Sequence, residues 1–304
     1  SKTNYFMEQH KNTLKPRLER DCPEEVATMI NLIQEMLSYP FMVRALIVGF
    51  LVALCASLLG VSMVLKRYSM IGDGLSHVGF GALSIATALN VAPLIISLPV
   101  VVLSAFLLLR IKENSKIKGD AAIAIISTGS LAIGVMVISM STGMNTDVCN
   151  YLFGSILGVK QNEVVLTILL SVVVLGLFIL FYNRIFAVTF DETFAKATGT
   201  KANLYNMLIA LLTAFTIVLG MRTMGALLIS SLIIFPALTS MRVFKQFRKV
   251  VVCSAILSVF CFISGLIMSY IYATPTGASV AILNIGFFLL FSIVGWLQGK
   301  RCRQ

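Results

Sequence analysis

Two residues of one segment, Asp73 and His77, could bind a metal ion. They stand four residues apart, and in an α-helix that spacing places both side chains on one face, a turn apart. A carboxylate and an imidazole together suit zinc, manganese or iron(II). Because a structural metal site normally closes with four ligands, two ligands predict transient binding, as in a carrier. Alternatively, Asp73 caps the N-terminus of its helix and His77 finds a backbone partner at the membrane interface.

The segment that carries both residues, from Gly72 to Val91, is unusually poor in large side chains. Ten of its twenty residues are Gly, Ala, Ser or Thr. Such a helix offers little apolar surface to lipid but lets other backbones approach closely. We therefore predict that it packs inside a helix bundle, where an ionisable side chain by default marks a functional pathway.

The composition excludes a water-soluble globule. Of 304 residues, 58% are apolar and only 12% are charged, whereas about a quarter of a soluble domain is charged. A span needs about 20 mostly apolar residues, and only a helix pairs the backbone of such a run internally. The predicted fold class is an all-α polytopic membrane protein with eight or nine transmembrane helices.

Nine apolar runs are the candidate spans. They cover residues 41–65, 72–91, 93–111, 120–141, 163–187, 201–220, 221–241, 249–272 and 276–297. We predict a polar tail with an amphipathic interfacial helix over 1–40, a transmembrane domain over 41–297, and a basic cytoplasmic tail over 298–304. Eight spans result if one run is re-entrant, or if the two runs that meet at Met221 form one broken helix.

The positive charges predict an orientation. Of 24 Lys and Arg residues, 16 follow odd-numbered runs, five lie in the tail and three lie elsewhere. Because loops rich in Lys and Arg stay cytoplasmic, we predict a cytoplasmic C-terminus, with the N-terminal tail external for nine spans or internal for eight. The charges form short clusters between apolar runs, which is typical of contact with the lipid bilayer and not with nucleic acid.

A polar loop from Thr189 to Asn206 is a second candidate site. Residues 190–197 favour a short helix that ends at a glycine, and two phenylalanines share one of its faces while its charged residues lie outside that face. A hydrophobic knob on a charged intracellular loop predicts docking to another protein; the alternative is a solvated helix without a partner. The candidate docking residues are Phe190, Asp191, Glu192, Phe194 and Gly199.

Pro236 stands within an otherwise apolar run. A proline removes one helix hydrogen bond and clashes with the preceding turn. It therefore predicts a local bend, which either serves movement or is a tolerated kink.

The sequence carries no motif of a membrane-embedded enzyme. It has no H-E-x-x-H, no Walker motif and no G-x-S-x-G. The six cysteines form no C-x-x-C pair, so we predict that they are small buried hydrophobes and not disulfides or zinc ligands. We predict neither enzymatic activity in this chain nor a permanently bound cofactor.

Five segments in order resemble the ABC-3 metal permeases, the membrane subunits of ABC importers for zinc and manganese. They are LSYPFMVRALIVGFLVALCASLLG, LKRYSMIGDGLSHVGFGAL, LFGSILGV, FDETFAKATGT and MGALLISSLIIFPALTS. The resemblance runs from about Leu37 to Leu297. Gly74 stands where many relatives have Ala, and Phe80 where many have a small residue or Pro. Both differences affect helix packing and leave the ligand types intact.

The resemblance implies a permease that works as a pair in a bacterial plasma membrane. Its partners would be two cytoplasmic ATPase subunits and an extracytoplasmic metal-binding protein, and the transported ion would be zinc or manganese. The role in the metal pathway carries over to Asp73 and His77, and ATPase coupling to the segment from Asp191 to Gly199. ATP hydrolysis would occur on the partner chain and would drive alternating access.

Two other functions remain open on the residues. An ion-coupled secondary transporter would act without an ATPase partner. Such carriers usually show internal repeats and more intramembrane charges, whereas Asp73, His77 and Asp120 are the candidates here. A membrane scaffold without transport is the third possibility.

Overall fold

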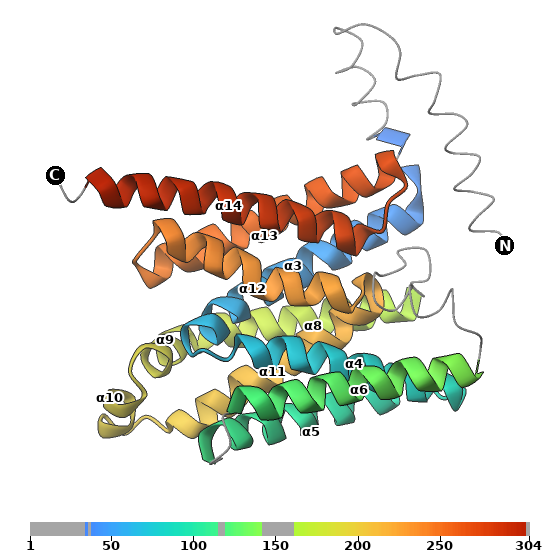
Figure 1. Ribbon diagram of the computed structural model, residues 1–304, viewed down its shortest axis with the longest axis horizontal. Coiled ribbons are helices and arrows are strands. Elements are labelled where there is room, and N and C mark those ends of the chain that lie inside the picture. Colours follow the sequence, from blue (N-terminus) through green and yellow to red (C-terminus); the bar gives the residue numbers. More distant parts are fainter. Residues whose placement is uncertain (1–33, 36–37, 115–118, 142–160, 302–304) are drawn as a thin grey trace, which may run out of the picture.

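The computed structural model describes residues 34–35, 38–114, 119–141 and 161–301, and the regular elements in these ranges are all helices. They are α3 (Pro40–Leu65), α4 (Ser69–Ala88), α5 (Pro93–Asn114), α6 (Gly119–Ser141), α8 (Gln161–Leu180), α9 (Tyr182–Phe190), α10 (Glu192–Ala197), α11 (Ala202–Met224), α12 (Ala226–Val243), α13 (Phe247–Tyr272) and α14 (Thr276–Arg301). The long helices run side by side as a bundle (Figure 1). The predicted all-α class is confirmed for this part of the chain.

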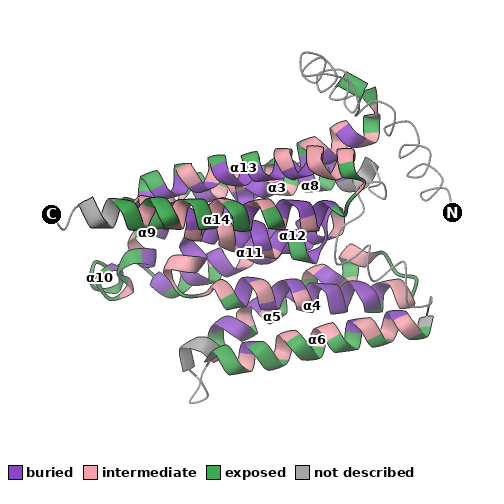
Figure 2. Cartoon of the chain, turned by 45° about the horizontal axis from the view of Figure 1, so that its top comes forward, coloured by how far each residue is buried: buried purple, intermediate pink, exposed green. Residues whose placement is uncertain are grey.

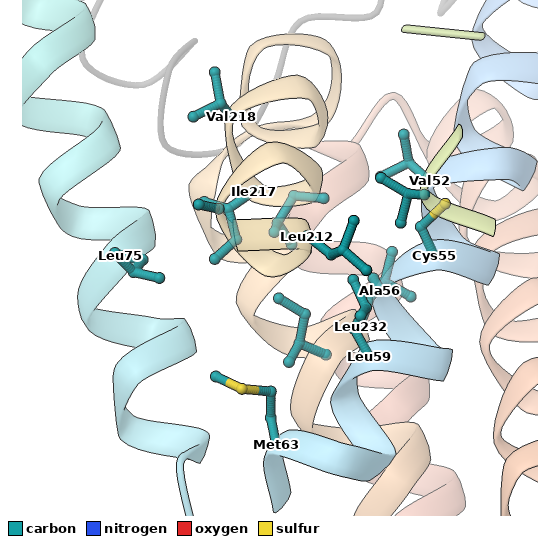
Figure 3. Close-up of a cluster of buried hydrophobic side chains, with 14 of the residues drawn as sticks. Val52, Cys55, Ala56, Leu59, Met63, Leu75, Leu212, Ile217, Val218 and Leu232 are labelled. Carbon is teal, nitrogen blue, oxygen red and sulfur yellow. The ribbon is translucent and has the colours of Figure 1, made fainter. Parts of the chain in front are cut away.

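Helices α3 and α11 form the centre of the bundle. Two-thirds (67%) of the residues in their apolar stretches are buried, against 11% in α14, and Figure 2 shows α6 and α14 with largely exposed outer faces. Side chains of α3, α4, α11 and α12 meet in the core, among them Leu59, Leu75, Ile217 and Leu232 (Figure 3). The exposed faces are apolar as well, as surfaces that contact lipid must be.

Seven of the described helices are long and apolar enough to cross a membrane, or eight if α8 and α9 together form one bent span. The prediction of eight or nine therefore slightly exceeds the number found. Of the predicted spans, α4 is the one that is not apolar enough, because half of its predicted run consists of small residues and it also carries Asp73 and His77.

Two predicted runs differ in where they break. The run 163–187 is divided at Phe181 into α8 and α9, which are inclined by 68°. The boundary predicted at Met221 lies instead at Gly225, whose φ of 90° is a conformation that glycine adopts without strain. Helices α11 and α12 are each long and apolar enough to span by themselves, so the alternative of one broken helix here is not needed.

The turn after α3, the turn between α12 and α13, and the C-terminal end of α14 lie at one end of the bundle (Figure 1). These are segments in which the sequence places clusters of positive charge. Helix α14 continues to Arg301, so it enters the segment predicted as a basic tail. Most of the predicted surface helix of the N-terminal tail, and the segment LFGSILGV, lie outside the described residues.

Candidate functional site

Helix α4 is held at its start by a tight turn from α3. The amide of Arg67 donates to the carbonyl oxygen of Val64 at 3.0 Å, and the amide of Tyr68 donates to that of Met63 at 2.7 Å. This pair of bonds is the Schellman arrangement that ends many helices. The left-handed residue it requires is Arg67, with φ of 59°, where glycine is usual.

Helix α4 packs against α5, α6, α11 and α12, as its small residues predict. At Gly81, an added Cβ would lie 2.7 Å from the backbone oxygen of Ser130 on α6, which is too close for any side chain. At Gly74, it would lie 3.0 Å from a methyl group of Ile123, so the glycine found here in place of Ala suits the space. The predicted close approach of backbones to this helix is confirmed.

Asp73 and His77 point toward each other. The imidazole Nε2 lies 3.7 Å from the carboxylate Oδ2, and the two side chains are 28% and 40% exposed for His77 and Asp73 respectively. This separation is longer than a hydrogen bond. The two groups form an ion pair only when the imidazole is protonated. Both groups are partly buried and partly accessible, as transient ligands need to be.

The capping interpretation of these residues is wrong for Asp73. Helix α4 begins at Ser69 with Tyr68 as its N-cap, so Asp73 lies in the second turn, beyond the free amides that a cap would satisfy. Nor does the Nδ1 atom of His77 find a partner: it is buried and has no hydrogen bond within the described residues.

The side chains that could bind a metal ion here are one carboxylate, of Asp73, and one imidazole, of His77. Within the described ranges, no group of three or more His, Cys, Asp or Glu side chains could hold a metal ion. A closed structural site of four ligands is therefore not formed by this part of a single chain. The geometry permits a weak, exchangeable contact with a divalent cation.

A contact that the sequence did not predict ties this helix to α12. The hydroxyl of Ser76 donates to the backbone oxygen of Asp73 at 2.7 Å and lies 2.7 Å from the hydroxyl of Ser230. Ser76 is fully buried. Because Ser230 lies 154 residues away, no local signal in the sequence could have identified this pair.

The second candidate segment is divided between two helices. Phe190 ends α9. Asp191 has extended backbone and is the N-cap of α10, and its carboxylate accepts a hydrogen bond from the amide of Phe194 at 2.9 Å. The predicted short helix over 190–197 is found as α10, but it begins two residues later than predicted because Asp191 caps it, and Phe190 belongs to α9 instead. Phe190 and Phe194 are nonetheless both solvent-exposed, at 60% and 65%. Gly199 follows α10 with φ of 79°, as its predicted role at a helix end requires.

Phe190 belongs to an aromatic cluster at this end of the bundle. Its ring lies 5.0 Å from that of Phe186 and 6.2 Å from that of Phe247, between ring centroids. Phe186 and Phe247 are themselves 5.0 Å apart. The cluster anchors the end of α9 on the start of α13, so Phe190 is held in place while most of its surface remains exposed.

Glu192 points toward the bundle, although the sequence places it outside the hydrophobic face. Its carboxylate lies 3.2 Å from Lys66 Nζ and 2.8 Å from Lys196 Nζ, and it accepts a hydrogen bond from Asn206 at 3.1 Å. Burial raises the pKa of Glu192, but the hydrogen bonds from Lys196 and Asn206 and the charge of Lys66 outweigh it and lower the pKa to about 2. This carboxylate is therefore ionised at every physiological pH.

Pro236 is buried within α12, which continues through it. The hydroxyl of Ser240 donates to the backbone oxygen of Pro236 at 2.8 Å. The bend that the proline predicts stays a prediction.

Comparison with known proteins identifies the family. The model of the ABC 3 transport family matches residues 38–295. The manganese transport system membrane protein MntC of Halalkalibacterium halodurans is 28% identical over 278 residues, 89% of this chain and 95% of that protein. The high-affinity zinc uptake system membrane protein ZnuB of Haemophilus influenzae is 30% identical over 246 residues, 81% and 94% of the two chains.

A solved structure agrees with these relatives. PsaBC from Streptococcus pneumoniae in complex with Fab is similar with a TM-score of 0.77 and 28% identity, and the match covers 86% of this chain and 94% of that chain. The resemblance seen in the sequence motifs is confirmed. With a family match over most of its length and several apolar spans, this multi-pass membrane protein belongs to the ABC 3 transport family.

Proposed function

We propose that this chain is the membrane permease subunit of an ATP-driven importer of divalent transition metal ions, zinc or manganese. The observation that carries the proposal is the pair Asp73 and His77, whose Oδ2 and Nε2 atoms lie 3.7 Å apart on a helix packed within the bundle. These ligand types bind both ions. Two protein ligands leave the metal exchangeable, and the metal is therefore cargo and not a resident cofactor.

The proposed partners follow from the family and from the exposed segment at α9 and α10. Cytoplasmic ATPase subunits would dock on the segment that carries Phe190, Asp191, Glu192, Phe194 and Gly199. An extracytoplasmic protein would deliver the metal, and a second copy of the permease would complete the pathway. ATP hydrolysis belongs to the partner, because this chain contains no Walker motif. We place it in a bacterial plasma membrane with its C-terminus in the cytoplasm, where positive loops remain.

Membership in the ABC 3 transport family does not favour the rival function of an ion-coupled secondary transporter. That function would predict metal uptake in vesicles that contain the permease but no ATPase and no ATP. The proposed function predicts none.

The central prediction concerns the two ligands. Asp73→Ala and His77→Ala should each lower zinc or manganese uptake at least about tenfold, since the loss of even an outer partner of a metal ligand costs about that much. Uptake would be measured with each radioactive metal in cells that lack other importers, with the amount of permease in the membrane determined alongside.

Leu89→Ala provides the matched control. Leu89 follows the C-terminal end of α4, far along the helix from Asp73 and His77, and it is 62% exposed. It should transport as the unaltered protein does. Normal accumulation of both metals in the Asp73 and His77 variants would remove the proposed site.

A further inference from the structure

Lys66 has a more deeply buried side chain than Lys196, the other lysine that forms an ion pair with Glu192. Its side chain is only 5% exposed, and lysines are almost never this buried unless they are paired. Its Nζ lies 3.2 Å from the carboxylate of Glu192, donates to the side-chain oxygen of Asn206, and lies 5.5 Å from the ring centroid of Tyr68. The charge is therefore held by groups on several sides.

The partners of Lys66 come from different elements. Lys66 is the C-cap of α3, Glu192 is the first residue of α10, and Asn206 lies near the start of α11. Asn206 also donates to Glu192 at 3.1 Å, which closes a triangle of hydrogen bonds. The triangle thus joins α10 to the turn between α3 and α4.

The connection from Lys66 to the metal ligands is short and stiff. Tyr68, which lies beneath the Lys66 ammonium, is the N-cap of α4, and its amide is bonded back to Met63. Asp73 follows Ser69, the first residue of the same helix, by four residues. A hydrogen-bonded helix can move as a unit over one or two turns, so a displacement at Lys66 would carry Asp73 and His77 with it.

We propose that Lys66 is a positioning residue that couples α10 to helix α4, so that movement of α10 changes the position of Asp73 and His77. The proposal rests on the proposed function, in which an ATPase subunit docks on the α9 and α10 segment. It assigns the inner side of α10 to transmission toward the metal site and its outer side to docking.

The test compares ATP hydrolysis with transport in one preparation. The permease is reconstituted with its ATPase partner in vesicles, and ATP hydrolysis and uptake of radioactive manganese are measured together. Lys66→Met keeps most of the side chain's length and removes the charge. We expect ATP hydrolysis to persist while manganese transported per ATP falls about tenfold, the effect of losing a charge-assisted hydrogen bond.

Two variants serve as controls. Lys201→Met removes an exposed lysine from the nearby connection between α10 and α11 and should leave transport per ATP unchanged. Lys66→Arg keeps the charge and should retain transport per ATP near that of the unaltered complex. Size-exclusion chromatography of each complex verifies that permease and ATPase remain assembled.

Three results would count against these ideas, and they can be told apart. Unchanged transport per ATP in Lys66→Met would overturn the coupling role. A proportional loss of hydrolysis and transport in that variant would overturn it as well, because Lys66 would then serve only to hold the fold. If the unaltered complex binds no ATPase or moves neither manganese nor zinc, the proposed function itself fails, whatever the variants do.

Discussion

The carboxylate of Glu192 experiences two opposing effects. Partial burial penalises its charge, while Lys196, Asn206 and Lys66 stabilise it. The stabilising contacts win because charge-assisted hydrogen bonds are about twice as strong as neutral ones. Since the side chain is 32% exposed, water screens part of this gain. The group links α10 to the rest of the protein only while it is ionised.

Stability should therefore depend on pH in a predictable direction. The pKa of Glu192 is about 2 in the folded protein and 4.5 ordinarily, so its contribution is complete above about pH 4.5 and is lost as the pH falls toward 2. We expect the unaltered protein to be more stable than Glu192→Gln at pH 7, and this difference to vanish near pH 2. Unfolding of both proteins in detergent across that range measures it. A difference that stays constant down to pH 2 would contradict the assignment.

Helix α4 shows why an element can lie within a membrane bundle without a high hydropathy. Its small residues, together with Asp73 and His77, leave it less apolar than the other long helices, and the small residues also allow backbone contact with α6 at Gly81. Association of helices in lipid depends on such close packing and not on hydrophobic burial, because lipid tails are as apolar as leucine. The small residues that lower the hydropathy of α4 are thus also the residues that let it pack closely in the bundle.

A matched pair of glycine substitutions tests this packing. Gly81→Ala introduces a Cβ 2.7 Å from the backbone oxygen of Ser130, whereas Gly129→Ala on α6 meets nothing within 4 Å. We expect Gly81→Ala to destabilise the protein by about 1–3 kcal/mol, as overpacking does. Gly129→Ala should be neutral or stabilising by about 1 kcal/mol, from its helix propensity. Denaturant unfolding in detergent distinguishes them, and equal effects would refute the contact.

On the scale of the whole molecule, the two candidate sites lie on different helices of the bundle. The pair Asp73 and His77 lies on α4, and the exposed phenylalanines lie on α9 and α10 at one end (Figure 1). Most of the remaining exposed surface of the long helices is apolar and suits lipid. An exposed aromatic pair beside ionised side chains is better suited to a protein partner.

The proposed docking of an ATPase subunit gives a prediction for the whole molecule. Phe190→Ser with Phe194→Ser should release the ATPase subunit during purification, because the exposed apolar contact is lost. Phe194→Ser alone isolates the docking contribution, since Phe190 also packs against Phe186 and Phe247. Leu204→Ser, at an exposed apolar residue of α11, should retain the ATPase. Undisturbed co-purification of the double variant would place docking elsewhere.

The sequence by itself determined the features that depend on composition and local spacing. A chain with 58% apolar residues had to form membrane helices. The four-residue spacing of Asp73 and His77 had to bring them to one helix face. The small residues around them predicted close packing, and the ordered motifs identified the family. These inferences hold because each rests on neighbours along the chain.

The tertiary structure alone decided which distant residues complete these sites. Lys66 meets Glu192 across 126 residues and Asn206 across 140, and Ser76 meets Ser230 across 154. Such contacts depend on how each helix is rotated and how deeply it lies in the bundle. Hydrophobic periodicity does not reveal that rotation here, because in lipid the outer face of a helix is as apolar as the inner one.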